Sequence, residues 1–456
     1  MRRKLWTSII AVAIVCTSLF AVSADKPKQN SSGDHWIATW ATSQLLTPMV
    51  FRMPPNMPRP QTSEKTSTVP PPGTSSPDAK AERPHTPPPP RSGPMASNLP
   101  QKFEDETVRM LARTTVGGRR VRVELSNMLN AEPLQVGAAH IAIHKGGGEI
   151  VQGTDRMLTF GGSKSFTIPP GVLVVSDPVD LDLPALSEFA VSLYLPHDTG
   201  APTNHMLGLH TAYIAKGDVT GSVSMPNAST MFAYVWLSGV DVVAPPDAYT
   251  VVALGDSITD GYGTTRDADR AWPFLLAKRL SANKRTRNIA VVNQGISGNQ
   301  VLRDGAGLSA LARIDRDVLS RPGVKWVILL EGINDINLWG RSDGPEALTA
   351  EQLIWGYRQI IDRCHLHNIK VIGATIMPQE GVPTYTERGE QVRQAVNQWI
   401  REKGNFDAVV DFDAITKDPK RPVRLKEEFN PGDHIHPNDA GNQAMADAFN
   451  LDWFRM

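Results

Sequence analysis

The sequence predicts two fold types in one chain, an all-β region followed by an α/β region built on a parallel sheet. From about residue 106 to 243 apolar and polar residues alternate with a period of two, which is typical of short antiparallel strands. After Pro245 and Pro246, short apolar runs alternate with helical stretches. That order is typical of a parallel sheet with helices on both faces. The 456 residues are too many for one small module.

The amino end has the three-part layout of a secretory signal. Basic residues at positions 2–4 precede an apolar run over residues 9–20, and small residues stand before Asp25. The run is shorter than the roughly 20 residues that span a bilayer, which favours a cleaved signal over an uncleaved anchor. We therefore expect residues 1–24 to be removed. The mature protein would then be secreted or periplasmic, without stable membrane insertion.

Charge and cysteine content exclude further classes. The chain has 47 Lys and Arg against 47 Asp and Glu, so no basic excess exists to neutralise a phosphate backbone, and nucleic acid is not an expected partner. Of the two cysteines, Cys16 lies in the predicted signal. Cys364 would then stand alone in the mature chain, where it could form no internal disulfide.

A leading strand and a proline-rich segment occupy residues 25–105. Residues 35–40 have the apolar character of a short strand, and sixteen prolines follow between Pro48 and Pro100. Such a composition favours extended polyproline conformations and cannot bury a core. Because a strand precedes the prolines, we interpret the segment as an insertion into a domain and not as a link between two.

Residues 106–245 are predicted to form an all-β sandwich. Gly, Pro, Asn and Asp separate several short alternating runs, as in sandwiches of this kind. The strands that we expect are 121–125, 140–143, 179–183, 189–195 and 231–237. Nothing in this region reveals its chemistry.

Residues 246–456 are predicted to form the α/β domain. The expected strands are 251–254, 289–292, 326–330, 371–376 and 409–410. The expected helices are 272–282, 308–319, 350–367, 387–402 and 438–449. In such a sheet ligands bind at the carboxyl ends of the strands, so those ends should hold the functional residues.

Ser257 follows the first of these strands directly, within the sequence GDSI at 255–258. At a strand-to-helix turn its hydroxyl would meet the positive end of a helix dipole at the carboxyl edge of the sheet. That position suits a nucleophile. Taken alone, an ordinary helix N-cap explains the serine better, because serine is a preferred cap.

The partners that a nucleophile needs lie in the sequence DHIHP at 433–437, before the last helix. A serine hydroxyl is a weak nucleophile until a base takes its proton, and the base needs an acceptor that fixes its tautomer. His436 and Asp433, three residues apart, could fill these roles. The alternative is a metal pair of His434 and His436. No further set at ligand spacing accompanies that pair, which favours the catalytic interpretation.

Two further polar clusters end the second and third strands, at 293–299 (NQGISGN) and 331–335 (EGIND). A tetrahedral oxyanion needs prepositioned donors, and a glycine N–H or an asparagine amide can supply them. Each cluster alone is explained more simply as a turn. All of the polar clusters in order, each at a carboxyl end, indicate one site.

Some other patterns are set aside. Ser297 lies in a sequence that lacks the G-x-S-x-G spacing of a nucleophile elbow, so it is a poor rival to Ser257. Residues 305–310 match a dinucleotide fingerprint but lie too far beyond their strand, and we interpret them as a helix start. Core packing is the expected role of Trp272, Trp339 and Trp355, in preference to lining a pocket.

As a set, these blocks resemble the SGNH hydrolases, also called the GDSL esterase and lipase family. The resemblance runs from about residue 248 to the end and rests on GDSI at 255–258, GISGN at 295–299, GIND at 332–335 and DHIHP at 433–437. Isoleucine stands where leucine is commoner in the first block. The family fold is a flavodoxin-like three-layer α/β/α sandwich with about five parallel strands, and we expect that fold here.

The resemblance implies a role for each matched residue. Ser257 would be the nucleophile and would also lend its backbone N–H to the oxyanion hole. Gly298 would give a second N–H, and Asn334 its side-chain amide. His436 would be the base that Asp433 orients, and neither metal nor cofactor would be needed.

The resemblance therefore implies a serine esterase that hydrolyses carboxylic esters through an acyl-enzyme. The front half also resembles exported family members that carry an N-terminal β-sandwich and are often grouped with xylan esterases. This implies short acyl groups, acetyl on plant polysaccharide above all. The alternatives are an arylesterase or lysophospholipase, or a carbohydrate-binding protein that uses the catalytic fold as a scaffold.

Overall fold

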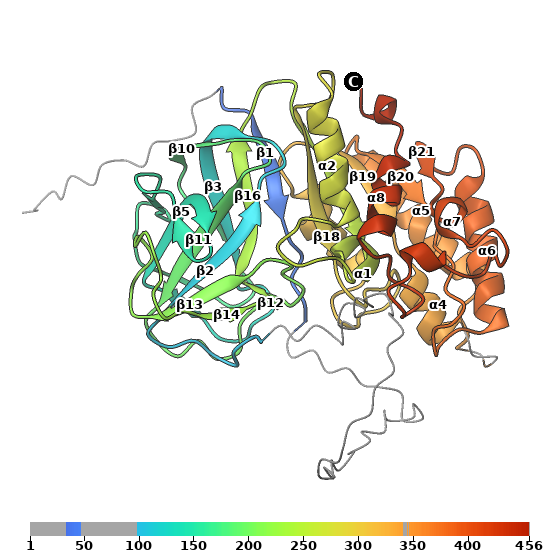
Figure 1. The fold of residues 1–456 in the computed structure, drawn as a ribbon, viewed down its shortest axis with the longest axis horizontal. Coiled ribbons are helices and arrows are strands. Elements are labelled where there is room, and N and C mark those ends of the chain that lie inside the picture. The colour runs from blue at the N-terminus through green and yellow to red at the C-terminus, as the bar shows by residue number, and fades with distance from the viewer. Residues whose placement is uncertain (1–32, 47–97, 341–343, 345, 456) are drawn as a thin grey trace, which may run out of the picture.

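The computed structural model describes residues 33–46, 98–340, 344 and 346–455. The predicted signal and most of the proline-rich segment lie outside these residues. An all-β region and an α/β region lie side by side in Figure 1, the first on the left and the second on the right. The coarse fold prediction is confirmed, because a parallel sheet with helices follows an all-β region.

Two antiparallel sheets build the β region around one apolar core. The first has the order β1-β16-β3-β10, with β9 beside β3, and comprises β1 (Trp36–Ala41), β16 (Leu237–Val243), β3 (Gly118–Ser126), β10 (Val179–Leu183) and β9 (Leu173–Val175). Val123 of β3 is fully buried in a core that it shares with Val191 of the second sheet. The period-two alternation therefore reflects inward-facing apolar side chains.

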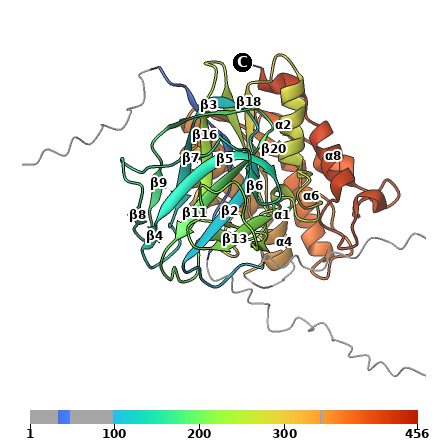
Figure 2. The same cartoon turned by 60° about the vertical axis from the view of Figure 1, so that its left-hand side comes forward.

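The second sheet has the order β14-β13-β2-β11-β5-β6, with β7 beside β5. Its strands are β14 (Ser229–Met231), β13 (Ala212–Lys216), β2 (Glu106–Arg113), β11 (Glu188–Leu195), β5 (Ala138–Gly146), β6 (Glu149–Ile150) and β7 (Arg156–Met157). Figure 2 brings β5, β11, β2 and β13 to the front. Two small pairs complete the region: β4 (Leu134–Val136) with β8 (Phe166–Ile168), and β12 (Asn204–His205) with β15 (Tyr234–Val235).

The prediction of one strand over 231–237 is wrong. β14 ends at Met231, β15 covers two residues, and β16 begins at Leu237. The chain turns at Trp236, whose φ of 55° is in the left-handed region. The indole is fully buried and meets the ring of Phe103 edge to face. Packing of this large side chain therefore overrides the local alternation.

The α/β region is built on β17 (Tyr249–Gly255), β18 (Ile289–Gly295), β19 (Val324–Leu330), β20 (Lys370–Ala374) and β21 (Ala408–Val410). In the described part of the chain these strands form one parallel sheet in the order β18-β17-β19-β20-β21. The strand order reverses at β17, so the crevice outside the carboxyl ends of β17 and its neighbours is a topological switch point. The sequence blocks around Ser257 lie at this edge.

The helices form two groups whose members contact one another. One group comprises α2 (Trp272–Ala282), α7 (Phe412–Thr416) and α8 (Asp439–Asp447). The other comprises α3 (Ala310–Ile314), α4 (Ile333–Trp339), α5 (Ala350–Leu366) and α6 (Glu387–Arg401). Right-handed crossovers require these groups on opposite faces of the sheet. None of the helices described has the length and apolar character needed to cross a bilayer.

Helix predictions succeeded where the pattern was long. The starts of α2, α5 and α6 agree with the predicted ranges, whereas the short helices α4, α7 and α1 (Ser257–Asp260) were not predicted. The predicted helix 308–319 is divided: α3 covers its first half and a π-helix, Asp315–Leu319, the second. Two 3-10 turns, Glu427–Phe429 and Leu451–Phe454, lie near the carboxyl end.

Candidate active site

The turn between β17 and α1 holds Ser257 at the carboxyl edge of the sheet. Asp256 caps the helix, accepting a hydrogen bond from the backbone N–H of Ile258 at 2.9 Å. A Cβ on Gly255 would lie 2.1 Å from the hydroxyl oxygen of Thr259, so only glycine fits before the cap. The sharp turn leaves Ser257 as the first residue of the helix, nearly buried.

Ser257 comes together with Asp433 and His436 although it lies 179 positions before His436 in the sequence. The hydroxyl oxygen of Ser257 lies 2.7 Å from Nε2 of His436. Nδ1 of the same ring lies 2.8 Å from Oδ2 of Asp433. Because a carboxylate only accepts, Nδ1 carries a proton and donates it, which leaves Nε2 of a neutral ring to accept from the serine.

The loop before α8 fixes the carboxylate. Oδ1 of Asp433 accepts hydrogen bonds from the backbone N–H groups of Ile435 at 3.1 Å and His436 at 3.0 Å. Burial alone would raise the pKa of Asp433, but the hydrogen bonds that it accepts from the ring of His436 and from the backbone outweigh burial and lower that pKa below the usual value. Asp433 is therefore ionised at neutral pH.

An aromatic ring that the sequence did not indicate covers the histidine. The ring of Tyr262 lies 4.3 Å from that of His436, centroid to centroid. Its backbone N–H donates to the carbonyl of Ser257 at 2.9 Å. Tyr262 thus follows Ser257 by five residues and packs on the imidazole, a contact that only the fold creates.

The residues predicted to hold an oxyanion lie at the ends of β18 and β19. Gly298 has a φ of 81°, a left-handed conformation that favours glycine. Asn334, in the first turn of α4, donates its side-chain amide to the carbonyl of Asn299 at 2.9 Å. An amide nitrogen carries two hydrogens, so the second remains for a ligand. This bond joins the two loops that sequence analysis assigned to one site.

Ser297, the alternative nucleophile, and His434, half of the alternative metal pair, form hydrogen bonds with residues outside the Ser257, His436 and Asp433 set. The hydroxyl of Ser297 donates to Oδ2 of Asp260 at 2.7 Å. Nδ1 of His434 lies 3.0 Å from the side-chain amide of Asn430, whereas His436 lies between Asp433 and Ser257. Among the residues that the structure describes, no group of three or more His, Cys, Asp or Glu is arranged to hold a metal ion.

The three tryptophans differ in their surroundings. Trp272 is fully buried and stacks on Phe449, so the expectation of core packing is right for it. Trp339 is partly buried and donates its indole N–H to Gln300 at 2.7 Å, beside the loop after β18. For Trp355 the expectation is wrong, because 55% of it is exposed on α5. Its place on the outer face of an amphipathic helix explains the difference.

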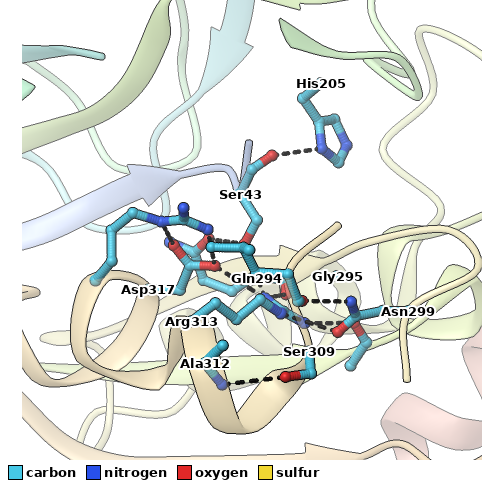
Figure 3. A network of polar contacts seen from close by, with 12 residues as sticks. Ser43, His205, Gln294, Gly295, Asn299, Ser309, Ala312, Arg313 and Asp317 are labelled. Atoms are coloured by element: carbon cyan, nitrogen blue, oxygen red, sulfur yellow. Dashed lines mark hydrogen bonds and ion pairs between the residues drawn. The ribbon is translucent and has the colours of Figure 1, made fainter. Parts of the chain in front are cut away.

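A buried arginine behind the site was missed by sequence analysis. Arg313 of α3 donates to the carbonyl oxygens of Gly255 at 3.0 Å and Gln294 at 2.7 Å, and to Oε1 of Glu331 at 3.2 Å. It also donates to Oδ1 of Asn299 at 2.9 Å (Figure 3). One guanidinium thus ties together the carboxyl ends of β17, β18 and β19. An arginine on the apolar face of a predicted helix was the available signal.

Arg313 pairs with the buried carboxyl groups of Glu331 and Asp317, and further buried carboxyl groups lie in the same strand-end loops. Burial raises the pKa of Asp256 to about 7 and that of Asp335 to about 6. Burial likewise raises the pKa of Glu331 well above its ordinary value. Asp317, by contrast, is ionised. Burial would raise its pKa, but the charges of Arg316 and Arg313 outweigh burial and lower the pKa to about 2. These groups support the strand ends from behind the nucleophile.

Fold and site together define the class of protein as a hydrolase with a serine, histidine and aspartate arrangement at a parallel-sheet switch point. Residues 253–444 match the model of the GDSL-like lipase/acylhydrolase family. This part of the chain belongs to that family, the SGNH hydrolases, and the protein is a carboxylic ester hydrolase.

Solved structures with a similar fold include Axe2, an acetylxylan esterase from Geobacillus stearothermophilus. Its identity to this chain is 25% and the TM-score 0.33, over 46% of this chain and 94% of that one. A GDSL-like lipase from Bacteroides thetaiotaomicron has 18% identity and a TM-score of 0.34, over 45% of this chain and 87% of its own. No curated protein matches the sequence.

Proposed function

We propose that the protein hydrolyses short-chain esters, acetyl esters of carbohydrate in particular, through an acyl-enzyme on Ser257. The observation that carries the proposal is the 2.7 Å contact between the serine hydroxyl and Nε2 of His436, whose other nitrogen bonds to Asp433. A serine with a neutral imidazole so oriented can lose its proton as it attacks a carbonyl.

The proposed reaction has two halves. Ser257 attacks the ester carbonyl carbon while His436 takes its proton, and the tetrahedral oxyanion accepts hydrogen bonds from the N–H groups of Ser257 and Gly298 and from the amide of Asn334. The intermediate collapses, and the alcohol leaves with the proton from His436. Water then attacks the acyl-enzyme by the same steps, releasing the acid and free Ser257.

The proposed substrate follows from the β region and from the amino end of the chain. An antiparallel β region precedes the hydrolase part of the chain, as it does in the exported family members often grouped with xylan esterases. Export of the mature protein, which the basic and apolar amino end supports, would place the enzyme where plant polysaccharide occurs. An acetyl group on a sugar is therefore the substrate we propose.

A panel of model esters tests the proposal. We expect turnover to fall as the acyl chain of p-nitrophenyl esters lengthens, and acetylated xylan to release acetate. Ser257→Ala should lose both activities, whereas Ser297→Ala should lower p-nitrophenyl acetate hydrolysis without abolishing it, because Ser257 stays in place. A preference for aryl acetates without release from xylan would indicate an arylesterase, and a preference for lysophospholipids a lysophospholipase. Xylan binding by a hydrolytically inert wild type would indicate a binding protein.

A further inference from the structure

Two residues of the β region, Ser43 and His205, contact residues next to the candidate active site. Ser43, just after β1, accepts hydrogen bonds from Nη1 of Arg313 at 3.0 Å on its hydroxyl and from Nδ1 of His205 at 2.8 Å on its carbonyl. Figure 3 shows both contacts. Ser43 also donates its hydroxyl proton to the side-chain oxygen of Gln294 in β18. The interface between the two regions is thus polar at this point.

His205 of β12 has an acceptor at each ring nitrogen. Nδ1 faces the carbonyl of Ser43, and Nε2 lies 3.0 Å from Oδ1 of Asp260. Neither oxygen can donate, so both nitrogens carry a proton and the ring is an imidazolium. The side chains of His205 and Asp260 are each only 4% exposed. A buried ion pair therefore joins the β region to the last residue of α1.

The other oxygen of Asp260 holds the loop that follows β18. Oδ2 accepts hydrogen bonds from the backbone N–H of Ser297 at 2.9 Å and from its hydroxyl at 2.7 Å. Ser297 immediately precedes Gly298, whose N–H is assigned to the oxyanion. The far side of the same loop is held by Arg313 on Asn299.

We propose that His205 is a positioning residue for ester hydrolysis: it fixes Asp260, and through Asp260 it sets the direction of the Gly298 N–H toward the oxyanion. This inference rests on the proposed function of Ser257 and Gly298. The β region is then a part of the catalytic apparatus and not an independent binding module.

Electrostatics support a charged tether. Burial by itself would lower the pKa of His205, but the charge and hydrogen bond of Asp260 outweigh burial and raise that pKa. In a buried ion pair, loss of one partner leaves the other charge uncompensated, here the carboxylate of Asp260. Asp260 would then turn to any donor within reach, and the loop would lose its fixed anchor.

Two amide substitutions separate the two bonds of the ring. In His205→Asn the amide nitrogen reaches about as far as Nδ1, toward Ser43, and loses Asp260. In His205→Gln it reaches about as far as Nε2 and can still donate to Asp260. We expect His205→Asn to lower kcat about ten- to a hundredfold with KM nearly unchanged, as misplacement of a transition-state donor does. His205→Gln should stay within a few-fold of wild type.

His210 supplies the matched control. It is also buried at the interface and its Nε2 lies 2.9 Å from Oδ1 of Asp269, but that pair does not bind Ser297. His210→Asn should lower the thermal midpoint with kcat unchanged. Equal loss of kcat in His205→Asn and His205→Gln, or an equal loss in His210→Asn, would mean general loosening and overturn the inference.

Hydrogen exchange gives a readout that does not depend on catalysis. We expect peptides that cover residues 295–299 to exchange faster in His205→Asn than in wild type, and at the wild-type rate in His205→Gln and His210→Asn. Unchanged exchange in His205→Asn overturns the inference even if the wild type proves to be an esterase. Should His205→Asn not fold, Ser297→Ala tests the same anchor. It removes one bond to Asp260, so faster exchange at 295–299 is expected and unchanged exchange contradicts the anchor.

Discussion

At the residue scale, the position of the proton on His436 determines whether its ring can act as a base toward Ser257. The bond from Nδ1 of His436 to Asp433 fixes which nitrogen faces Ser257, and the backbone N–H groups on Asp433 fix the carboxylate in turn. Such a chain of bonds holds the base in one tautomer before any substrate arrives. The reactivity proposed for Ser257 thus depends on the loop before α8, which orients His436 and Asp433, as well as on the serine itself.

Asn334 is expected to act mainly in the transition state. Loss of one oxyanion donor costs about 2.7 to 4 kcal/mol, or roughly a hundred- to a thousandfold in rate. Asn334→Ala should lower kcat by that factor with little change in KM. Asn334→Asp should be worse, because it puts a negative charge where negative charge develops. Near wild-type kcat in a folded Asn334→Asp would mean that the residue only shapes the turn.

The acid limb of activity should reflect one proton. His436 must be neutral to accept the proton of Ser257. Asp433, with its lowered pKa, is already ionised at neutral pH and adds no second proton. The logarithm of kcat/KM should therefore rise with a slope of one as the imidazole loses its proton. A slope of two would mean that Asp433 titrates with the ring.

Activity should be the same before and after dialysis against EDTA. Serine, histidine and aspartate can complete the proposed reaction among themselves. Loss of activity that a divalent ion restores would contradict this, and would favour the metal pair of His434 and His436.

Sequence predicted the residues whose signals are local and missed those whose partners are distant. Ser257 and Asn334 follow strands within a few positions, so their blocks can be read from the chain. His205 meets Asp260 across 55 positions, and Ser43 meets Arg313 across 270. No periodicity encodes such pairs, because only the packing of two regions creates them.

At the element scale, the candidate site lies at strand ends, and the short helices are the elements that the sequence did not predict. Runs such as α5 and α6 span several turns and show an apolar face, so their starts were predicted to the residue. Helix α1 has four residues, too few for a periodic pattern, yet it carries Ser257, the proposed nucleophile. The π-helix after α3 is a departure that a regular helical pattern cannot predict. The contact of Arg313 with Asp317 at 3.1 Å, by contrast, joins residues four apart, as in an ordinary helix.

Asp256 links the cap of α1 to pH-dependent stability. Its pKa rises on folding from 3.8 to about 7, so the native state binds the extra proton between these values. Stability that this group contributes is present below about pH 4 and is lost as pH rises toward 7. Asn keeps the cap without the charge. The thermal midpoint of Asp256→Asn should exceed that of wild type at pH 8 and match it near pH 4; the opposite trend would mean that the buried carboxylate stabilises the fold.

At the scale of the whole molecule, the two regions share their cores. β1 lies against β18, the edge strand of the parallel sheet (Figure 1). Ala38 of β1 packs in the core of the α/β region, and Ala290 of β18 packs in that of the β region. The hydroxyl of Thr115 accepts a hydrogen bond from the N–H of Val291 at 3.2 Å. The β region therefore covers the edge strand β18, whose unpaired N–H and C=O groups could otherwise pair with another chain.

A chain that begins at residue 246 should not fold to an active enzyme. It lacks β1 and the side chains that cover β18, and it also lacks Ser43 and His205, which bind Arg313 and Asp260, the two residues that hold the loop after β18. We expect an aggregated or partly folded product by gel filtration and circular dichroism, with no esterase activity. A soluble monomer with wild-type kcat would show that the β region is dispensable.

The central claim is that catalysis passes through an acyl group on Ser257. The direct measurement is mass spectrometry of peptides from enzyme mixed with a slowly turned-over ester and quenched in acid within one turnover. The acyl mass is predicted on the peptide that contains Ser257, and it should be missing from Ser257→Ala. Acyl mass on the peptide of Ser297, or full turnover by Ser257→Ala, would contradict the account.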